Sequence, residues 1–392
     1  MPKVKKIIFF VESPFCRRDY ERFGVDIIRK NGFEVEAWDF TPFLHPDLHG
    51  NVKAEDPGDR DGHKLFNTLK RASYAISRID KDECMIVCMI SYSLISYAIF
   101  RALSNNNIRY CMFGANAIPL VNDSAIMPRI SRVFDKGGFG RMLNSLFLRI
   151  PHKLIGVRPA AMFLAGGSGS VHFGRFYPRD NSTKTIPIHT LDYDIYLREG
   201  KANISTDSMT GVFLDEDVCF HPEYIIRNEK PYSTAEEYFP LLRDFFDHLE
   251  NRLGIKITVA AHPRSRYEDH PGYFGDRPVI KGRTIELVKK SRFVMAHNSS
   301  SINFAVLYGK PIIFITTDDL KRSPQGRLIE RIASIFEKNP INLNDGFEID
   351  LEKELAIDGR VYGRYAESYI KIPNSGDRLF WQIFSDNVKE FG

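Results

Sequence analysis

The chain has 392 residues, of which 43% are hydrophobic and 27% charged, a composition that excludes disordered and fibrous proteins. Single hydrophobic cores stop growing at roughly 250 to 300 residues, so a chain of this length is expected to form two domains. The net charge of +4 is too small to indicate nucleic-acid binding, and no segment approaches the roughly 20 apolar residues that a membrane-spanning helix requires.

The cysteines and the N-terminus indicate a cytoplasmic protein. The five cysteines are odd in number, lack metal-type pairing and mostly lie in or beside apolar runs, which is typical of reduced, buried thiols. At the N-terminus a basic start precedes an apolar run at 7–11, as in a signal peptide. That run is too short and gives way to Glu12-Ser13-Pro14, so we interpret it as the first strand.

Strand and helix patterns alternate through the first 120 residues. Apolar runs predict strands at 6–11, 33–38, 85–90 and 109–113. Amphipathic periodicity predicts helices at 16–31, 64–79 and 93–104. This alternation favours a parallel, doubly wound sheet. The polar segment 198–206 is typical of a linker, so we place an N-terminal Rossmann-like domain at 1–205.

A basic amphipathic insertion interrupts this domain at 128–159. Arginines and lysines stand there among phenylalanine, leucine and methionine, and Asp135 is the only opposing acid. Such a stretch can lie on an anionic membrane surface. It fits equally well a core helix with a solvated basic face. Both interpretations stay open at this stage.

Two polar segments before the linker carry less specific signals. The glycine-rich run 165–170 lacks the Lys-Ser/Thr ending of a P-loop and the spacing of a dinucleotide fingerprint, so we interpret it as a flexible turn. His189, Asp192 and Asp194 form a short polar cluster. A hydrogen-bonded turn explains that cluster better than a metal site does.

The second half of the chain repeats the alternation. Strands are predicted at 210–214, 255–261, 278–280, 293–296 and 312–316. Helices are predicted at 234–253, 284–290, 302–308 and 326–337. We place a C-terminal Rossmann-like domain at 206–375. The tail 376–392 predicts an amphipathic helix, and its return to the first domain would suit two domains with a cleft between them.

Polar residues follow three strands of the second half. Ligands of open α/β sheets bind past the carboxyl ends of the strands, where these residues lie. They are Asp215-Glu216-Asp217, His262-Pro263-Arg264 and Asn298-Ser299-Ser300-Ser301. Serine hydroxyls and unpaired amides at the start of a helix would make a phosphate seat that needs no metal.

Each of these groups also has a purely structural explanation. The serines could serve only to cap the helix at 302–308, His262 could be a hydrogen-bonded histidine at a strand end, and Asp215-Glu216-Asp217 could be a solvated turn. His221-Pro222 and His270-Pro271 lie away from predicted strand ends, so we place them outside the site.

The three groups, in this order, resemble motifs of the GT-B glycosyltransferases. More narrowly, they are similar to those of bacterial enzymes that use CMP-activated sugars, the polysialyltransferases and Kdo transferases, and of CDP-glycerol glycerophosphotransferases. The matching segments are the acidic motif 215–217, the HP motif His262-Pro263, and the serine motif, in which Ser299-Ser300 precede 303–307 and Lys310-Pro311. The acidic motif here lacks the glycine that follows it in polysialyltransferases.

The resemblance implies a fold and a set of roles. The fold is GT-B, two doubly wound Rossmann-like domains that face a central cleft, with the first on the acceptor side and the C-terminal helix crossing back to it. The acidic motif supplies the catalytic carboxylate, and His262 adds a proton or positive charge. The residues implied to bind the nucleotide phosphate are His262, Pro263, Arg264, Asn298, Ser299, Ser300 and Ser301. No metal and no cofactor are expected.

The expected function is therefore metal-independent glycosyl transfer. Kdo or a sialic-acid-like nonulosonate would move from a CMP-activated donor to a bacterial surface polysaccharide or lipid-linked glycan. In this function the insertion 128–159 would hold the protein on the inner face of the cytoplasmic membrane. Two alternatives remain, a UDP-sugar transferase or 2-epimerase of similar fold, and a non-catalytic glycan- or membrane-binding assembly subunit.

Overall fold

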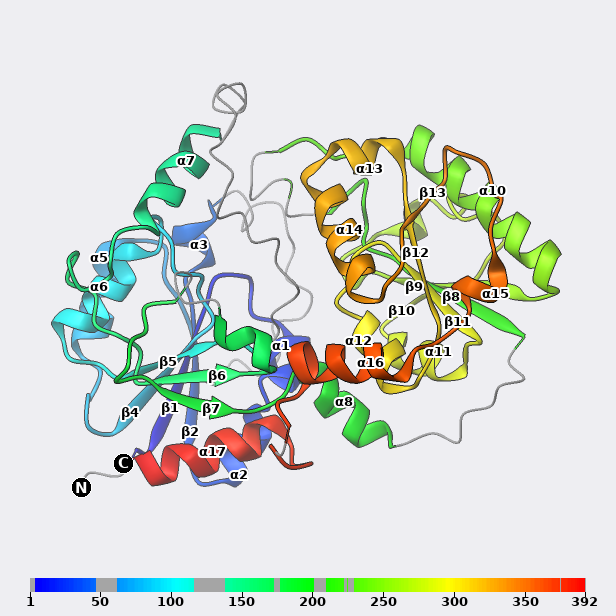
Figure 1. Cartoon of the computed structure of the whole chain (residues 1–392). Coiled ribbons are helices and arrows are strands. Elements are labelled where there is room, and N and C mark those ends of the chain that lie inside the picture. The colour runs from blue at the N-terminus through cyan, green and yellow to red at the C-terminus, as the bar shows by residue number, and fades with distance from the viewer. Residues whose placement is uncertain are drawn as a thin grey trace.

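The computed structural model describes residues 4–46, 62–115, 138–172, 177–200, 209–221, 224, 229–373 and 375–391. Within these residues the chain forms two parallel sheets, of seven and six strands, side by side (Figure 1). Their strand orders are β3-β2-β1-β4-β5-β6-β7 and β10-β9-β8-β11-β12-β13. Both orders reverse direction about the first strand of the sheet, which is the mark of a doubly wound fold.

The first sheet contains two strands, β6 and β7, that lie beyond the last strand predicted for this half of the chain. Its strands are β1 (Lys6–Val11), β2 (Glu34–Asp39), β3 (His63–Leu65), β4 (Cys84–Cys88), β5 (Tyr110–Phe113), β6 (Met162–Ala165) and β7 (Lys184–Pro187). Its helices are α1 (Arg17–Arg22), α2 (Val25–Lys30), α3 (Thr41–Leu44), α5 (Leu69–Ser77), α6 (Tyr97–Asn105), α7 (Gly138–Phe147) and η2 (Ser168–His172). We call these elements the first lobe.

The second sheet and its helices form the second lobe. Its strands are β8 (Thr210–Leu214), β9 (Lys256–Ala261), β10 (Val279–Lys281), β11 (Phe293–Ala296), β12 (Ile312–Thr316) and β13 (Ile341–Asn342). Its helices are α8 (Leu191–Glu199), α10 (Ala235–Leu253), η4 (Tyr267–Asp269), α11 (Thr284–Lys290), α12 (Ile302–Leu307), α13 (Asp318–Arg322), α14 (Pro324–Ile335), α15 (Leu351–Glu354), α16 (Gly359–Tyr365) and η5 (Ala366–Ile370).

Burial on both faces explains the uninterrupted apolar runs of the strands. In β1, Ile7 and Phe9 pack into one hydrophobic cluster, while Ile8 and Phe10 pack into another on the opposite face. The second sheet is likewise enclosed by two separate clusters. A strand that is covered on both faces has no polar side, so its sequence is apolar throughout. No helix of the described residues is long and apolar enough to cross a membrane.

Two predicted helices of the first lobe are wrong in their limits. The helix predicted at 16–31 is broken into α1 and α2, because Gly24 adopts a left-handed conformation with φ of 54°. The helix predicted at 64–79 begins only at Leu69, and the residues before it form the edge strand β3. Of the predicted insertion 128–159, residues 128–137 lie outside the described part of the chain, and α7 follows them.

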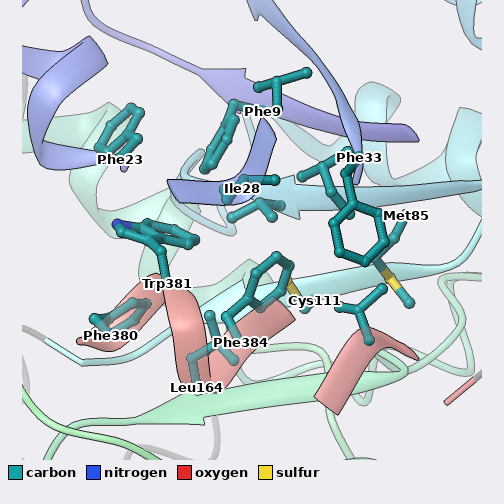
Figure 2. Packing of buried hydrophobic residues seen from close by; sticks show 14 of the residues in the cluster. Phe9, Phe23, Ile28, Phe33, Met85, Cys111, Leu164, Phe380, Trp381 and Phe384 are labelled. Carbon is teal, nitrogen blue, oxygen red and sulfur yellow. The ribbon is translucent and has the colours of Figure 1, made fainter. Parts of the chain in front are cut away.

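The C-terminal helix α17 (Phe380–Phe391) returns to the first lobe, as predicted. Figure 2 shows Trp381 of α17 packed among Phe9 and Phe23 of the first lobe. The Trp381 indole N–H also donates to the backbone carbonyl of Arg22 at 2.8 Å. Because Gly24 lies directly under this indole, the break between α1 and α2 makes room for the returning helix.

Hydrogen bonds join the segment 189–194 to the residues at the start of α17 and to α12. His189 is fully buried, and its ring nitrogens lie 2.9 Å from the carbonyl oxygen of Thr190 and 2.8 Å from that of Arg378. Asp194 accepts the N–H of Phe380 at 2.6 Å, while Asp192 accepts an N–H of Asn303 at 2.9 Å. Within the cluster, His189 Nε2 lies 3.5 Å from Asp194 Oδ1, while Asp192 bonds elsewhere.

The glycine-rich run also has a packing role. The segment η2 lies against η5 of the second lobe, and a Cβ on Gly167 would stand 2.3 Å from the carbonyl oxygen of Ser368. The absence of a side chain at this position permits that close approach.

Candidate functional site

The three polar groups come together at one edge of the second sheet. Strands β9, β8 and β11 are neighbours, and Leu214 of β8 pairs with Ala260 on one side and Ala296 on the other. Their carboxyl ends are therefore level. A cavity of about 370 Å³ opens there, and its lining residues are Glu216, Val218, His221, Tyr224, Glu229, Tyr232, His262, His297, Asn298, Ser299, Ser300, Leu320 and Gln325.

The predicted site residues divide into two sets. Five of them line the cavity, namely Glu216, His262, Asn298, Ser299 and Ser300. The others do not belong to that lining, and they are Asp215, Asp217, Pro263, Arg264 and Ser301. The acidic motif therefore presents only its middle residue to the cavity.

The buried Asp215 carboxylate joins the segments of the site. Its Oδ2 accepts the backbone N–H of His262 at 2.9 Å. Its Oδ1 accepts the N–H of Asp217 at 3.0 Å and the hydroxyl of Tyr267 at 2.9 Å. Burial raises the pKa of this carboxyl, although these hydrogen bonds act in the opposite direction. Asp215 thus fixes the acidic turn relative to the His-Pro turn.

Asp217 occupies a strained and buried position. Its φ of 53° is left-handed, a conformation that aspartate and asparagine tolerate better than most side chains. Burial, and then the charge of Asp215, raise the pKa of Asp217 to about 7. Its Oδ1 lies 3.5 Å from the hydroxyl of Tyr267, the same group that serves Asp215.

Glu216 points away from Asp215 and Asp217, toward residues 298–301, which we call the serine turn. Its Oε1 accepts the backbone N–H of Asn298 at 2.7 Å. Burial raises the pKa of Glu216 to about 8, with a further contribution from the charge of Asp215. The carboxyl is therefore mostly protonated at neutral pH.

His262 was expected to add a proton or a positive charge, and its surroundings favour the neutral imidazole. Burial, together with the positive potential of His221, Arg264 and Arg18, lowers its pKa to about 3. The backbone N–H of Arg264 donates to Nδ1 at 3.3 Å, so the ring proton resides on Nε2. A neutral imidazole of this tautomer offers one N–H donor.

His221 belongs to the site, although its sequence context placed it outside. Its ring lies 4.7 Å from that of His262, measured between centroids, with 58° between the ring planes. His221 stands four residues after Asp217, in the loop that leaves the same strand. That proximity to a strand end is the signal that could have identified it. Sequence reasoning also missed other lining residues, namely Tyr224, Glu229, Tyr232 and Gln325.

The serine turn differs from a simple helix cap. Ser301 occupies the N-cap position of α12 without a side-chain capping bond, and the Ser299 hydroxyl accepts the N–H of Ser301 at 3.3 Å. The preceding His297 is buried between the Ile315 carbonyl oxygen, 2.7 Å from Nδ1, and the Tyr238 hydroxyl, 2.6 Å from Nε2. Its pKa is lowered to about 4 by burial, so His297 is a neutral anchor of the turn.

Arginines of both lobes lie near the His-Pro turn. Arg18 and Arg22 come from α1, which stands between the lobes in Figure 1, and Arg264 comes from the second lobe. Arg22 keeps solvent-exposed surface, but the protein around it lowers its pKa, and the charges of Arg18 and Arg264 lower that pKa further while Asp192 raises it. All three side chains remain exposed to solvent. The edge of the cleft therefore attracts anions.

The described residues contain no preformed set of metal ligands. There, no group of three or more His, Cys, Asp or Glu side chains is arranged to hold a metal ion. The five cysteines are free, and four of them are buried.

Comparison with known proteins gives structural likenesses only. No protein-family model matches the chain, and none of the curated proteins matches it. The calicheamicin glycosyltransferase CalG4 is similar with a TM-score of 0.51 and 11% identity, over 99% of this chain and 98% of that chain. The H548A variant of the wall teichoic acid polymerase TagF gives a TM-score of 0.50 and 16% identity, over 100% and 89%.

A further TagF structure, the H444N variant soaked with CDPG, has a TM-score of 0.50 and 14% identity, over 100% of this chain and 89% of that chain. At such identities these likenesses concern the fold alone. Together with the two parallel sheets they show that the chain has the GT-B fold, which confirms the fold class predicted from the sequence.

Proposed function

We propose that this protein is a glycosyltransferase that moves a sugar from a CMP-activated donor. The observation that carries the proposal is the cavity at the carboxyl edge of the second sheet, where the acidic, His-Pro and serine turns meet. Such a crevice is where doubly wound sheets bind ligands. Kdo or a sialic-acid-like nonulosonate is the sugar that the resemblance favours, and a bacterial surface polysaccharide or lipid-linked glycan is the acceptor.

The lining groups suit a phosphate leaving group without a metal. Neutral His262 offers its Nε2–H, and Ser299 and Ser300 offer hydroxyls. Donors fixed in advance would stabilise the charge that develops on the departing phosphate. The acceptor hydroxyl needs a base. The pKa of Asp217 is raised to about 7, which suits a general base at neutral pH. Its carboxyl lies outside the cavity lining, so in this role the acceptor hydroxyl would approach from that side.

The lipid-linked acceptor is supported by an apolar surface beside α7. Exposed side chains gather there, namely Leu94, Ile95, Leu146, Ile150 and Leu154. The loop that contains Leu94 is tied to α7 by a hydrogen bond of 2.8 Å from its N–H to Asn144 Oδ1. Exposed Arg149 lies among these residues. Apolar side chains with an interleaved cation fit an anionic lipid surface.

Nucleotide binding tests the proposal. We expect CMP to raise the Tm of the protein more than UDP does, because a ligand that binds only the folded state stabilises it. A shift with UDP alone would replace the cytidine donor by the UDP-sugar alternative. No shift with CMP, CDP or UDP would favour a non-catalytic glycan- or membrane-binding subunit.

A further inference from the structure

The carboxyl group of Glu216 lies where the serine turn was expected to hold an anion. Leu214 and Ala296 are partners across β8 and β11, so Glu216 and Asn298 follow them by two residues each and stand opposite one another. The Asn298 N–H points at Glu216 Oε1, at 2.7 Å. An amide that a bound phosphate would use is therefore already satisfied by a carboxyl oxygen.

Arg18 and Arg264 lie near the His-Pro turn, but neither belongs to the lining of the cavity that Glu216 enters. Among the described residues that line the cavity there is no lysine or arginine. The charge of Asp215, from the same turn, acts on Glu216. The other titratable residues in the cavity lining are His221, Tyr224, Glu229, Tyr232, His262 and His297. The two histidines that flank it, His262 and His297, are neutral.

A ligand phosphate in this cavity would meet the Glu216 carboxyl directly. Two anions in contact, with no cation between them, repel each other strongly in a partly buried site. A protonated carboxyl has the opposite effect, because its O–H donates a charge-assisted hydrogen bond to the phosphate oxygen. Phosphate binding and ionisation of Glu216 should therefore exclude one another.

We propose that Glu216 is a hydrogen-bond donor to the phosphate of the nucleotide, and so determines that the site accepts an anion only while this carboxyl is protonated. Oε1 keeps the Asn298 N–H, and Oε2 carries the proton toward the ligand. The inference rests on the proposed function, because it takes the ligand to be a nucleotide. It separates Glu216 from the base, since a carboxyl that must stay protonated while the nucleotide is bound cannot take a proton from the acceptor hydroxyl.

The consequence is a pH-dependent affinity. Burial raises the pKa of Glu216 to about 8, so the protonated form predominates below that pH and is lost above it. Affinity for CMP should accordingly be constant from pH 7 to about 8 and then fall up to about tenfold per pH unit. The CMP phosphate itself titrates near pH 6, below this range, and so does not interfere.

Calorimetric titration of CMP into the whole protein between pH 7 and 9.5 tests the inference. We expect the wild-type Kd to rise above pH 8, and Glu216→Gln, whose amide still donates, to bind with a Kd that is constant over this range. Asp217→Asn removes the other carboxyl that titrates nearby. This variant should still lose affinity for CMP above pH 8, as the wild type does. Asparagine also tolerates the left-handed backbone at that position.

Two results would overturn the assignment of Glu216. One is wild-type CMP binding with an affinity that stays constant up to pH 9.5, a measurement that requires no variant to fold. The other is the same loss of affinity in Glu216→Gln as in wild type. If the folded protein binds neither CMP, CDP nor UDP at pH 7, the proposed function itself fails, and the role of Glu216 with it.

Discussion

Asp215, Glu216 and Asp217 follow one another at the end of β8, yet only Glu216 reaches the cavity. These residues lie beyond the end of β8, and the left-handed backbone of Asp217 turns its carboxyl to the same side as that of Asp215. Asp215 and Asp217 accordingly both face Tyr267, while Glu216 faces Asn298. The sequence predicted the motif, but it did not show which of the three carboxyls faces the cavity. It could not predict the neutral state of His262, which depends on burial and on charges brought from elsewhere in the chain.

The role of His262 can be tested by removing its donor. We expect His262→Ala to lower kcat by about 10² to 10³, the usual effect of losing one fixed donor to a developing anion. Release of CMP from a CMP-activated nonulosonate is the measurement. His270→Ala is the matched control, because this exposed histidine also precedes a proline, stacks on Tyr273 at 4.8 Å and lies outside the cavity lining. Equal turnover of the two variants would contradict the role of His262.

At the scale of elements, the sequence predicted strands better than helix limits. The strands of the second lobe that position the site were placed within one residue, since a strand buried on both faces must be apolar over its whole length. The break between α1 and α2 was missed because its cause lies far along the chain, in Trp381. Hydrophobic periodicity shows which face of a helix is apolar. It does not show which residue, more than 350 positions further along the chain, will pack against that face.

Gly24 should therefore be sensitive to a side chain. A Cβ there would stand 2.3 Å from Trp381 Cδ1, in addition to the strain of a φ of 54°. We expect Gly24→Ala to lower the free energy of unfolding by about 2 to 4 kcal/mol, from overpacking and backbone strain together. Gly32→Ala provides the control, because Gly32 also has a positive φ but has no atom within 4 Å of the added Cβ. Urea unfolding of both variants should give the larger loss for Gly24→Ala.

At the scale of the whole molecule, α1 of the first lobe lies close to α8 of the second lobe. Arg22 of α1 interacts electrostatically with Asp192, whose side chain also bonds Asn303 of the helix that follows the serine turn. The return of α17 fixes the same end of α1 through the Arg22 carbonyl. Two lobes were predictable from length and alternation. This connection was not, because neither Arg22 nor Asp192 lies in a motif, and their relation exists only after the chain has folded.

The apolar surface around α7 gives the last prediction. If Leu94, Ile95, Leu146, Ile150 and Leu154 enter a lipid surface, the protein should sediment with vesicles that contain phosphatidylglycerol and less with vesicles of phosphatidylcholine alone.

Leu146→Glu combined with Ile150→Glu should abolish most of this sedimentation, since carboxylates are repelled by anionic lipid and resist burial in it. Both side chains are at least 42% exposed, so the fold should tolerate the change. Tyr74→Glu is a suitable control, because this side chain is 70% exposed on α5 and lies outside the α7 surface. If the double variant sediments as wild type does, then the α7 surface does not bind the protein to the membrane.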